Sequence, residues 1–367
     1  MKINEDKQVN NQTKESDVNM EEKTIIKKLL FNPEGDDSIK NRKMIDGNTT
    51  NLFNLNNIKY TWAKDLYRLM MGNFWVPEKV DLTQDVNDYK ELTQEETTAF
   101  DAITSFLVFL DSIQTNNIPN ISDFITAPEV STLLAIQTYQ EAIHSQSYAY
   151  IIESIIPSDK REKIYDYWRD DKILLERNKF IAQIYQDFID NQTDIGFAKT
   201  LIANFILESL YFYNGFNFFY NLASRNLLLG VADQIRYINR DELSHVVLFR
   251  NMIRVINDEN PGLITQELVH DMFKTAVEQE IEWSNHIFDN SILGINEEST
   301  EKYTKYLAND RMRLLGFDPI YEGYSENPYQ HLERIADTAG DGVKANFFES
   351  TNTGYSQSSS VDGWDDL

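Results

Sequence analysis

The sequence predicts an all-α protein built from long helices packed into a bundle. Its 367 residues include 14 glycines and 8 prolines, about half of the ~12% combined share that is usual. Such a shortage of turn residues disfavours a sandwich or barrel of many short strands. Hydrophobic residues make up 41%, which is the composition of a globular protein. Several long apolar segments also begin and end with helix signals, so we expect helix to follow helix.

Composition excludes several functional classes. The formal net charge of −25 would repel phosphates and disfavours nucleic-acid binding. Cysteine is absent, so the chain has no disulfide, thiol nucleophile or thiolate metal ligand. We find no run of ~18 uninterrupted apolar residues, and the polar N-terminus lacks the apolar core of a signal peptide. We therefore expect a cytoplasmic protein.

Composition also divides the chain into three parts. Residues 1–55 are rich in Asn, Lys, Asp and Glu and predict a mobile arm, with a short helix around Ile25–Phe31. We expect residues 56–336 to form the helical domain. Residues 337–367 predict a flexible tail rich in Gly, Ser and Asn, with scattered large apolar residues: Phe347, Phe348, Tyr355, Trp364 and Leu367. Such a tail is either a docking peptide or a frayed end.

Within the central part, start and stop signals place the helices in order. Thr93 and Glu96 form a capping box that opens a helix through residues 99–114. Pro128 suits the first turn of the next helix, which Pro157 ends. Further helices are expected over Phe197–Ser224, from Gly230 to just before Asn260, and onward to about Leu315.

Two of these helices carry a single acid in an almost wholly apolar stretch. Asp111 lies in SFLVFLDSIQ and Glu208 in ANFILESLYFYNGF. A helix that is apolar on all sides is buried, and a buried ionised carboxylate must be paired or bound to a metal. Taken singly, each acid could equally lie at the surface of a helix with a narrower apolar stripe.

Histidine supplies the second half of the pattern. Glu141 and His144 are three residues apart, and so are Glu242 and His245, which places each pair on one helix face. The spacing alone is weak, because Glu267 and His270 share it and we interpret that pair as an exposed face. Asp233 precedes that third pair by the same distance as Glu208 precedes Glu242, but it lies among both polar and apolar residues rather than in an apolar stretch.

The combination is more specific than its parts. Asp111 precedes Glu141 by 30 residues, and Glu208 precedes Glu242 by 34. One acid from each of two helices and Glu-x-x-His from each of two others is the donor set of dinuclear metal centres in four-helix bundles. Four carboxylates balance two divalent cations, and oxygen with imidazole nitrogen suits iron or manganese. Tyr148, one turn after His144, could approach such a centre, although it could also be an ordinary core tyrosine.

These segments resemble the radical-generating small subunit of class I ribonucleotide reductase, a ferritin-like dinuclear carboxylate protein. The resemblance extends from about Trp75 to Asn327 and includes FWVPEKVDL, EAIHSQSYAYII, LESLYFY, INRDELSH, RMRLLGFD and SENP. It implies a ferritin-like helical bundle with two iron or two manganese ions in its core. Six residues match the metal ligands: Asp111, Glu141, His144, Glu208, Glu242 and His245.

The resemblance also implies a radical chemistry. The centre would activate an oxygen species and oxidise Tyr148 to a tyrosyl radical in a pocket of Phe212, Phe216 and Ile238. Trp75 and Asp241 would carry the oxidising equivalent outward, and Tyr355 would relay it to a large subunit that reduces ribonucleoside diphosphates to deoxyribonucleotides. The family implies a homodimer that docks on the large subunit by its C-terminal tail, with a flavoprotein activase if the metal is manganese.

Two other functions remain open at this point. A ferritin-like oxidase would act on a bound small molecule without a partner subunit. A metal-storage protein would form a much larger cage and would leave Tyr148 and the acidic tail without a role.

Overall fold

The computed structural model describes residues 22–337 and confirms the all-α fold, with no strand among those residues. Its helices are α1 (Trp62–Gly72), α2 (Asp85–Glu91), α3 (Gln94–Ser122), α4 (Pro128–Ile155), α5 (Arg161–Asp170), α6 (Lys172–Asp190), α7 (Asp194–Ile206), α8 (Tyr213–Ser224), α9 (Leu229–Glu259), α10 (Gln266–Phe288), α11 (Glu297–Leu315) and α12 (Gln330–Asp337), with a 3-10 turn η1 (Pro77–Lys79) and a π-helix η2 (Leu207–Tyr211).

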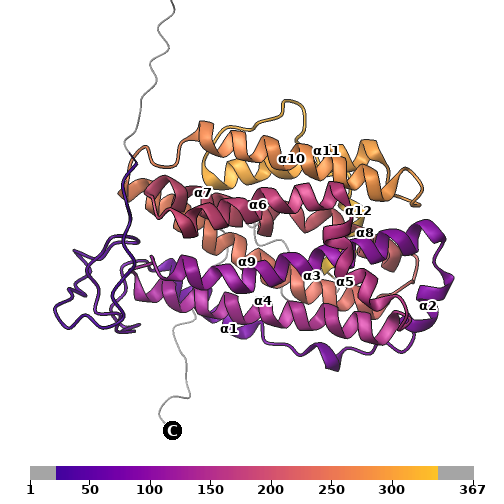
Figure 1. Cartoon of the computed structure of the whole chain (residues 1–367), viewed down its shortest axis with the longest axis horizontal. Coiled ribbons are helices and arrows are strands. Elements are labelled where there is room, and N and C mark those ends of the chain that lie inside the picture. Colours follow the sequence, from indigo (N-terminus) through magenta and orange to yellow (C-terminus); the bar gives the residue numbers. More distant parts are fainter. Residues whose placement is uncertain (1–21, 338–367) are drawn as a thin grey trace, which may run out of the picture.

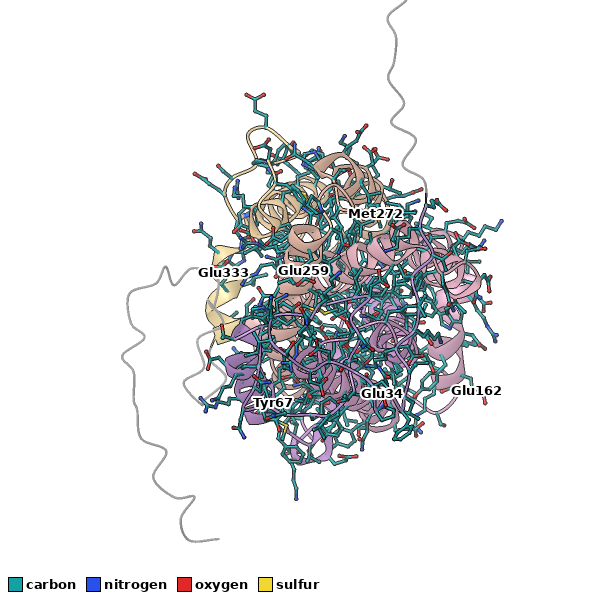
Figure 2. The ribbon with its side chains drawn as sticks, turned by 90° about the vertical axis from the view of Figure 1, so that its left-hand side faces the viewer. Glu34, Tyr67, Glu162, Glu259, Met272 and Glu333 are labelled. Atoms are coloured by element: carbon teal, nitrogen blue, oxygen red, sulfur yellow. The ribbon has the colours of Figure 1, made fainter. Side chains whose placement is uncertain are left out.

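The long helices run along the long axis of the molecule and enclose one core (Figure 1). α3 packs along α4, and α9 lies against both α4 and α7. α10 and α11 form a pair along one edge, opposite α1 and α4. Viewed from the end of the bundle, Met272 of α10 and Tyr67 of α1 lie on opposite sides of Glu259 in α9 (Figure 2). Helices α3, α4, α7 and α9 thus surround the middle of the bundle.

The predicted helix starts are confirmed. The Thr93 hydroxyl accepts the Glu96 N–H at 3.2 Å, and the Glu96 carboxylate accepts the Thr93 N–H at 3.0 Å. α4 begins at Pro128 and ends at Ile155, two residues before Pro157. These signals are local, since a cap satisfies backbone groups of its own first turn.

The start of α9 is fixed by residues that sequence reasoning did not single out. The Asp85 carboxylate in α2 accepts the N–H groups of Gly230 and Val231 at 3.3 and 2.7 Å. Asp88 accepts the Leu228 N–H at 2.9 Å. A Cβ on Gly230 would lie 2.4 Å from the Asp81 carbonyl oxygen, so glycine is required there. Two acids of α2 thereby cap the helix that carries Glu242 and His245.

The expected single helix over Phe197–Ser224 is interrupted. α7 ends at Ile206, the π-helix η2 follows, and α8 begins at Tyr213. The stretch Asp194–Ser224 is long and apolar enough to cross a membrane, but 83% of its most apolar window is buried inside the bundle. It is the core helix of this fold, with a wider turn in its middle.

The N-terminal segment differs from the arm that the sequence predicted. Residues 22–55 contain no helix, so the short helix expected at Ile25–Phe31 is wrong. Ile25 and Met44 are fully buried against the body. Arg42 pairs with Glu129 of α4 at 3.2 Å, and both side chains are buried. This segment packs as an irregular strap, because most of the apolar residues in Ile25–Phe31 stay exposed and give a helix no buried face. Residues 1–21 and 338–367, and with them Tyr355, lie outside the described residues.

Candidate metal centre

Four helical segments bring six donor side chains to the centre of the bundle. Asp111 comes from α3, Glu141 and His144 from α4, Glu208 from η2, and Glu242 and His245 from α9. All six side chains have no exposed surface. The local sequence explains part of this burial, since Asp111, Glu208 and Glu242 have largely apolar or amide neighbours at i±3 and i±4.

The donors form two overlapping groups. Asp111, Glu141, His144 and Glu242 offer ligand atoms within 4.8 Å of one another, and so do Glu141, Glu208, Glu242 and His245. Glu141 and Glu242 belong to both groups. Two ions would therefore share Glu141 and Glu242, with one also held by Asp111 and His144 and the other by Glu208 and His245.

Both imidazoles point the same nitrogen at this cluster. His144 Nδ1 lies 3.0 Å from Glu242 Oε1 and 3.6 Å from Glu141 Oε2. His245 Nδ1 lies 3.0 Å from Glu242 Oε2 and 3.3 Å from Glu208 Oε2. The outer nitrogens have acceptors, because His144 Nε2 lies 3.2 Å from Asp241 Oδ2 and His245 Nε2 lies 3.0 Å from Gln140 Oε1. An outer N–H donor leaves the inner Nδ1 with its lone pair, as metal ligation requires.

The acids and imidazoles of this cluster shift one another's pKa values, because they are buried together. Burial, followed by the Glu141 charge, raises the pKa of Asp111, and the same two causes raise the pKa of Glu208. Against the effect of burial, the nearby carboxylates raise the pKa of both imidazoles. Several buried donor atoms also lack a hydrogen bond: both Asp111 carboxylate oxygens, Glu141 Oε2, Glu242 Oε1 and His144 Nδ1.

Two divalent cations would satisfy these groups. Four carboxylates supply four negative charges, and the open donor atoms are oxygens and an imidazole nitrogen, which suit iron or manganese. An unpaired buried charge is costly, so a chain that gathers four acids in its core requires such compensation. The residues present therefore fit a dinuclear metal centre.

A hydrogen-bonded chain leads from this centre toward the surface. The Trp75 indole N–H donates to Asp241 Oδ2 at 2.9 Å, and the same oxygen meets His144. Tyr237 stacks on Trp75 with ring centroids 5.2 Å apart. Asp241 is fully buried and Trp75 nearly so. The structure thus brings together the three residues Trp75, Asp241 and His144.

Tyr148 is buried one turn beyond His144 on α4. Burial, and next the Asp111 carboxylate, raise the pKa of its phenol, which keeps the hydroxyl protonated. Phe212, Phe216 and Ile238 are also buried, and the two phenylalanine rings stack in parallel with centroids 5.5 Å apart.

Sequence reasoning missed the amides that surround Glu208. Gln114 and Gln137 both donate to Glu208 Oε1, the latter at 2.8 Å, and the Tyr185 hydroxyl donates to Gln114 Oε1 at 2.9 Å. A signal was present, because Gln114 lies three residues after Asp111 and Gln137 lies four before Glu141. Glutamine in an apolar stretch is less conspicuous than an acid, since it carries no charge.

The third Glu-x-x-His pair lies away from the cluster, as the sequence suggested. Glu267 is exposed, and His270 Nε2 meets the Asp318 carbonyl oxygen at 2.9 Å. Asp233 is half exposed and pairs with Arg236.

Fold and donor set together define a class, the ferritin-like bundles that hold a dinuclear metal centre between four helices. The sequence profile of one family in this class, described as ribonucleotide reductase, small chain, matches residues 52–328. The chain belongs to this family.

Individual relatives agree with this assignment. The chain is 44% identical over 346 residues to the ribonucleoside-diphosphate reductase subunit beta of Treponema pallidum, covering 93% of this chain and 99% of that protein. The solved ribonucleotide reductase R2 subunit from Clostridium botulinum is 46% identical, with a TM-score of 0.83 over 86% of this chain and 99% of that one. The dimanganese(II)-NrdF of Streptococcus sanguinis, at 22% identity and a TM-score of 0.67, shares the fold.

Proposed function

We propose that this chain, as the small subunit of a ribonucleoside-diphosphate reductase, generates a tyrosyl radical at Tyr148 beside a dinuclear iron or manganese centre. The observation that carries the proposal is the convergence of six buried donors from four helical segments on two overlapping ligand groups. Tyr148 lies in the same buried core, where burial and the charges of Asp111, Glu242 and Glu141 raise the pKa of its phenol.

In this proposal each residue has a defined task. Asp111, Glu141, His144, Glu208, Glu242 and His245 hold the metal ions. When bound, the two ions would activate an oxygen species as the oxidant, and that oxidant would take one electron and the phenol proton from Tyr148. The raised pKa of Tyr148 keeps that proton on the oxygen until oxidation, and the apolar wall of Phe212, Phe216 and Ile238 excludes water and reductants.

Asp241 has two tasks in the proposal. It accepts a hydrogen bond from the His144 Nε2–H, which fixes the imidazole, and one from the Trp75 indole N–H, which couples the centre to the outside. The radical equivalent would leave through Trp75 and pass by way of Tyr355 to the large subunit, where ribonucleotides are reduced to deoxyribonucleotides.

The partners and parts belong to the same proposal. Residues 56–336 form the metal-binding domain, and residues 337–367 dock on the large subunit. The active form is a homodimer in the cytoplasm, and a flavoprotein activase assists if the metal is manganese.

Deleting residues 338–367 should then abolish binding to the large subunit while metal binding and the radical persist. Unchanged binding of the truncated chain would refute the docking role.

The Tyr148→Phe variant tests the radical itself. We expect it to bind two metal ions per chain as the wild type does, but to lose the tyrosyl radical signal in electron paramagnetic resonance and to lose reductase activity. Tyr150→Phe is the matched control, because its hydroxyl meets only the Val80 carbonyl oxygen, at 3.2 Å. A full radical signal in Tyr148→Phe would overturn the assignment.

A further inference from the structure

The π-helix η2 carries the donor Glu208 and interrupts an otherwise α-helical stretch. A π-turn contains one residue more than an α-turn, and such turns inside α-helices are frequent at functional sites. It also disturbs the regular pairing of backbone carbonyls, which then need other donors when they are buried. The whole of η2 is buried. This wider turn therefore needs partners from other elements to hold it in place.

Arg177 of α6 supplies one donor. Its side chain is fully buried, and Nη2 donates to the Tyr211 carbonyl oxygen at 3.1 Å. Glu280 of α10 accepts from Arg177 Nε at 2.8 Å and so fixes the guanidinium. The guanidinium carbon also lies 4.1 Å from the Phe106 ring centroid and 3.9 Å from that of Tyr211. The side chain is held between two rings and has little freedom to move.

Arg311 of α11 supplies the other donor. Its side chain is also buried, and Nε donates to the Ser209 carbonyl oxygen at 3.1 Å. Asp310 accepts from Nη1 at 2.6 Å. The two guanidinium groups thus contact η2 at residues 209 and 211, directly after Glu208.

We propose that Arg177 and Arg311 are positioning residues that hold η2 in its π-helical form and thereby aim Glu208 at the metal centre. The inference rests on the proposed metal-binding function and deepens it. Loss of the extra residue from the turn would rotate α7 by about 100° relative to α8, since each α-helical residue turns by that angle. Glu208 would then leave the site that it shares with His245.

A purely structural role makes a different prediction. If Arg177 and Glu280 serve only to join α6 and α10, their removal changes stability and leaves both metal sites alike. If they position Glu208, their removal selectively lowers the affinity of the metal site formed by Glu208 and His245. Donors beyond the ligands themselves typically contribute a factor of about 10–100 to metal affinity.

The first experiment removes the whole ion pair, with Arg177→Met and Glu280→Leu together. Removing both partners avoids the unpaired buried charge that would unfold a single variant. Mn²⁺ is titrated into the metal-free protein, and free Mn²⁺ is followed by electron paramagnetic resonance. We expect two tight sites in the wild type, and in the variant one tight site and one weakened by about 10- to 100-fold.

A matched control uses the buried pair of Arg42 and Glu129, which joins the N-terminal strap to the start of α4. Arg42→Met with Glu129→Leu should lower stability and keep two tight sites. Wild-type protein that binds fewer than two ions would overturn the proposed function itself. Two unweakened sites in the Arg177 and Glu280 variant would overturn only the positioning role.

The second experiment tests Arg311 without relying on metal. We compare hydrogen exchange of the amides of residues 207–213 in metal-free wild type, Arg311→Met and Arg311→Lys. Exchange should be faster in Arg311→Met than in the wild type, and Arg311→Lys, which keeps a charged donor, should show an intermediate rate. Identical exchange in all three proteins contradicts the inference.

Discussion

At the scale of single residues, the two histidines of the centre differ in their outer hydrogen bonds. His144 donates outward to an acid, Asp241, whereas His245 donates to an amide, Gln140. A carboxylate makes the imidazole a stronger base than an amide does. The two halves of the centre therefore differ in donor strength, although their ligands are nearly symmetric in sequence.

Asp241→Asn tests this difference. We expect the Asp111 and His144 side to lose metal affinity by about 10-fold or more, because the amide lacks the charge that supports His144. Mn²⁺ titration of the metal-free protein measures the effect. Asp233→Asn is the control, since Asp233 is half exposed and pairs with Arg236. Two sites of wild-type affinity in Asp241→Asn would contradict the expectation.

At the scale of elements, most helices begin and end where local chemistry directs them. The long helix α3, which carries Asp111, starts at the Thr93 capping box, and α4 starts at Pro128. The start of α9 depends instead on acids of α2, and the π-turn of η2 contacts arginines of α6 and α11. Local signals thus place a helix in the sequence, while contacts with other elements set the rotation of its donors.

Thr93→Ala tests the local part. Loss of the side-chain cap should cost about 1 kcal/mol in the free energy of unfolding, which lowers the thermal midpoint by about 2 °C in a domain of this size. Calorimetry of the metal-free protein measures the shift. Thr98→Ala serves as control, because that exposed hydroxyl bonds only within its own helix. A midpoint equal to that of the wild type would count against the cap.

The attachment of the N-terminal strap should depend on pH through Glu259. This carboxylate of α9 accepts the Met44 N–H at 2.8 Å, the Lys59 ammonium at 2.6 Å and the Tyr60 hydroxyl at 2.7 Å. Burial opposes ionisation, but these three donors together lower the pKa below its ordinary 4.5. A lowered pKa means that the contribution to stability is complete above about pH 4.5 and is lost as pH falls through the folded value.

Glu259→Gln measures that contribution. Above pH 4.5 we expect the variant to have a lower thermal midpoint than the wild type and faster hydrogen exchange in residues 43–60. The difference between the two proteins should shrink as pH falls below 4.5, because the wild-type carboxylate becomes protonated and resembles the amide. A difference that is constant or grows on acidification would be incompatible with this account.

At the scale of the whole molecule, the metal centre is a cross-link between segments distant in sequence. Its donors come from α3, α4, η2 and α9, and they concentrate four carboxylates inside a chain whose net charge is already −25. Repulsion among these carboxylates opposes folding, and two divalent cations would remove it.

Metal should therefore stabilise the entire fold. With the free ion at 100 times its dissociation constant, each site adds about 2.7 kcal/mol to the free energy of unfolding. The thermal midpoint should rise with Mn²⁺ concentration and fall again with a chelator. Glu267→Ala with His270→Ala, on the exposed third pair, should leave the rise unchanged. A midpoint that does not respond to Mn²⁺ would speak against the centre.

Much of the fold and of the donor set follows from patterns between residues close together in the sequence. The spacing of Glu141 with His144 and of Glu242 with His245 places each pair on one helix face by helical geometry alone. The packing of the N-terminal strap was not predictable in this way. Ile25 and Met44 are buried by contacts with the body of the bundle, and the helical spacing around Ile25 gave no sign of that packing.

The sequence by itself determined the helices and the kinds of donor, because capping boxes, prolines and the 3.6-residue period act within a few residues of one another. Only the tertiary structure decided that Glu141 and Glu242 face both ligand groups, that Gln114 and Gln137 hold Glu208, and that η2 widens beside two buried arginines. These features depend on how helices rotate against each other, and that rotation is set by packing between segments far apart in the chain.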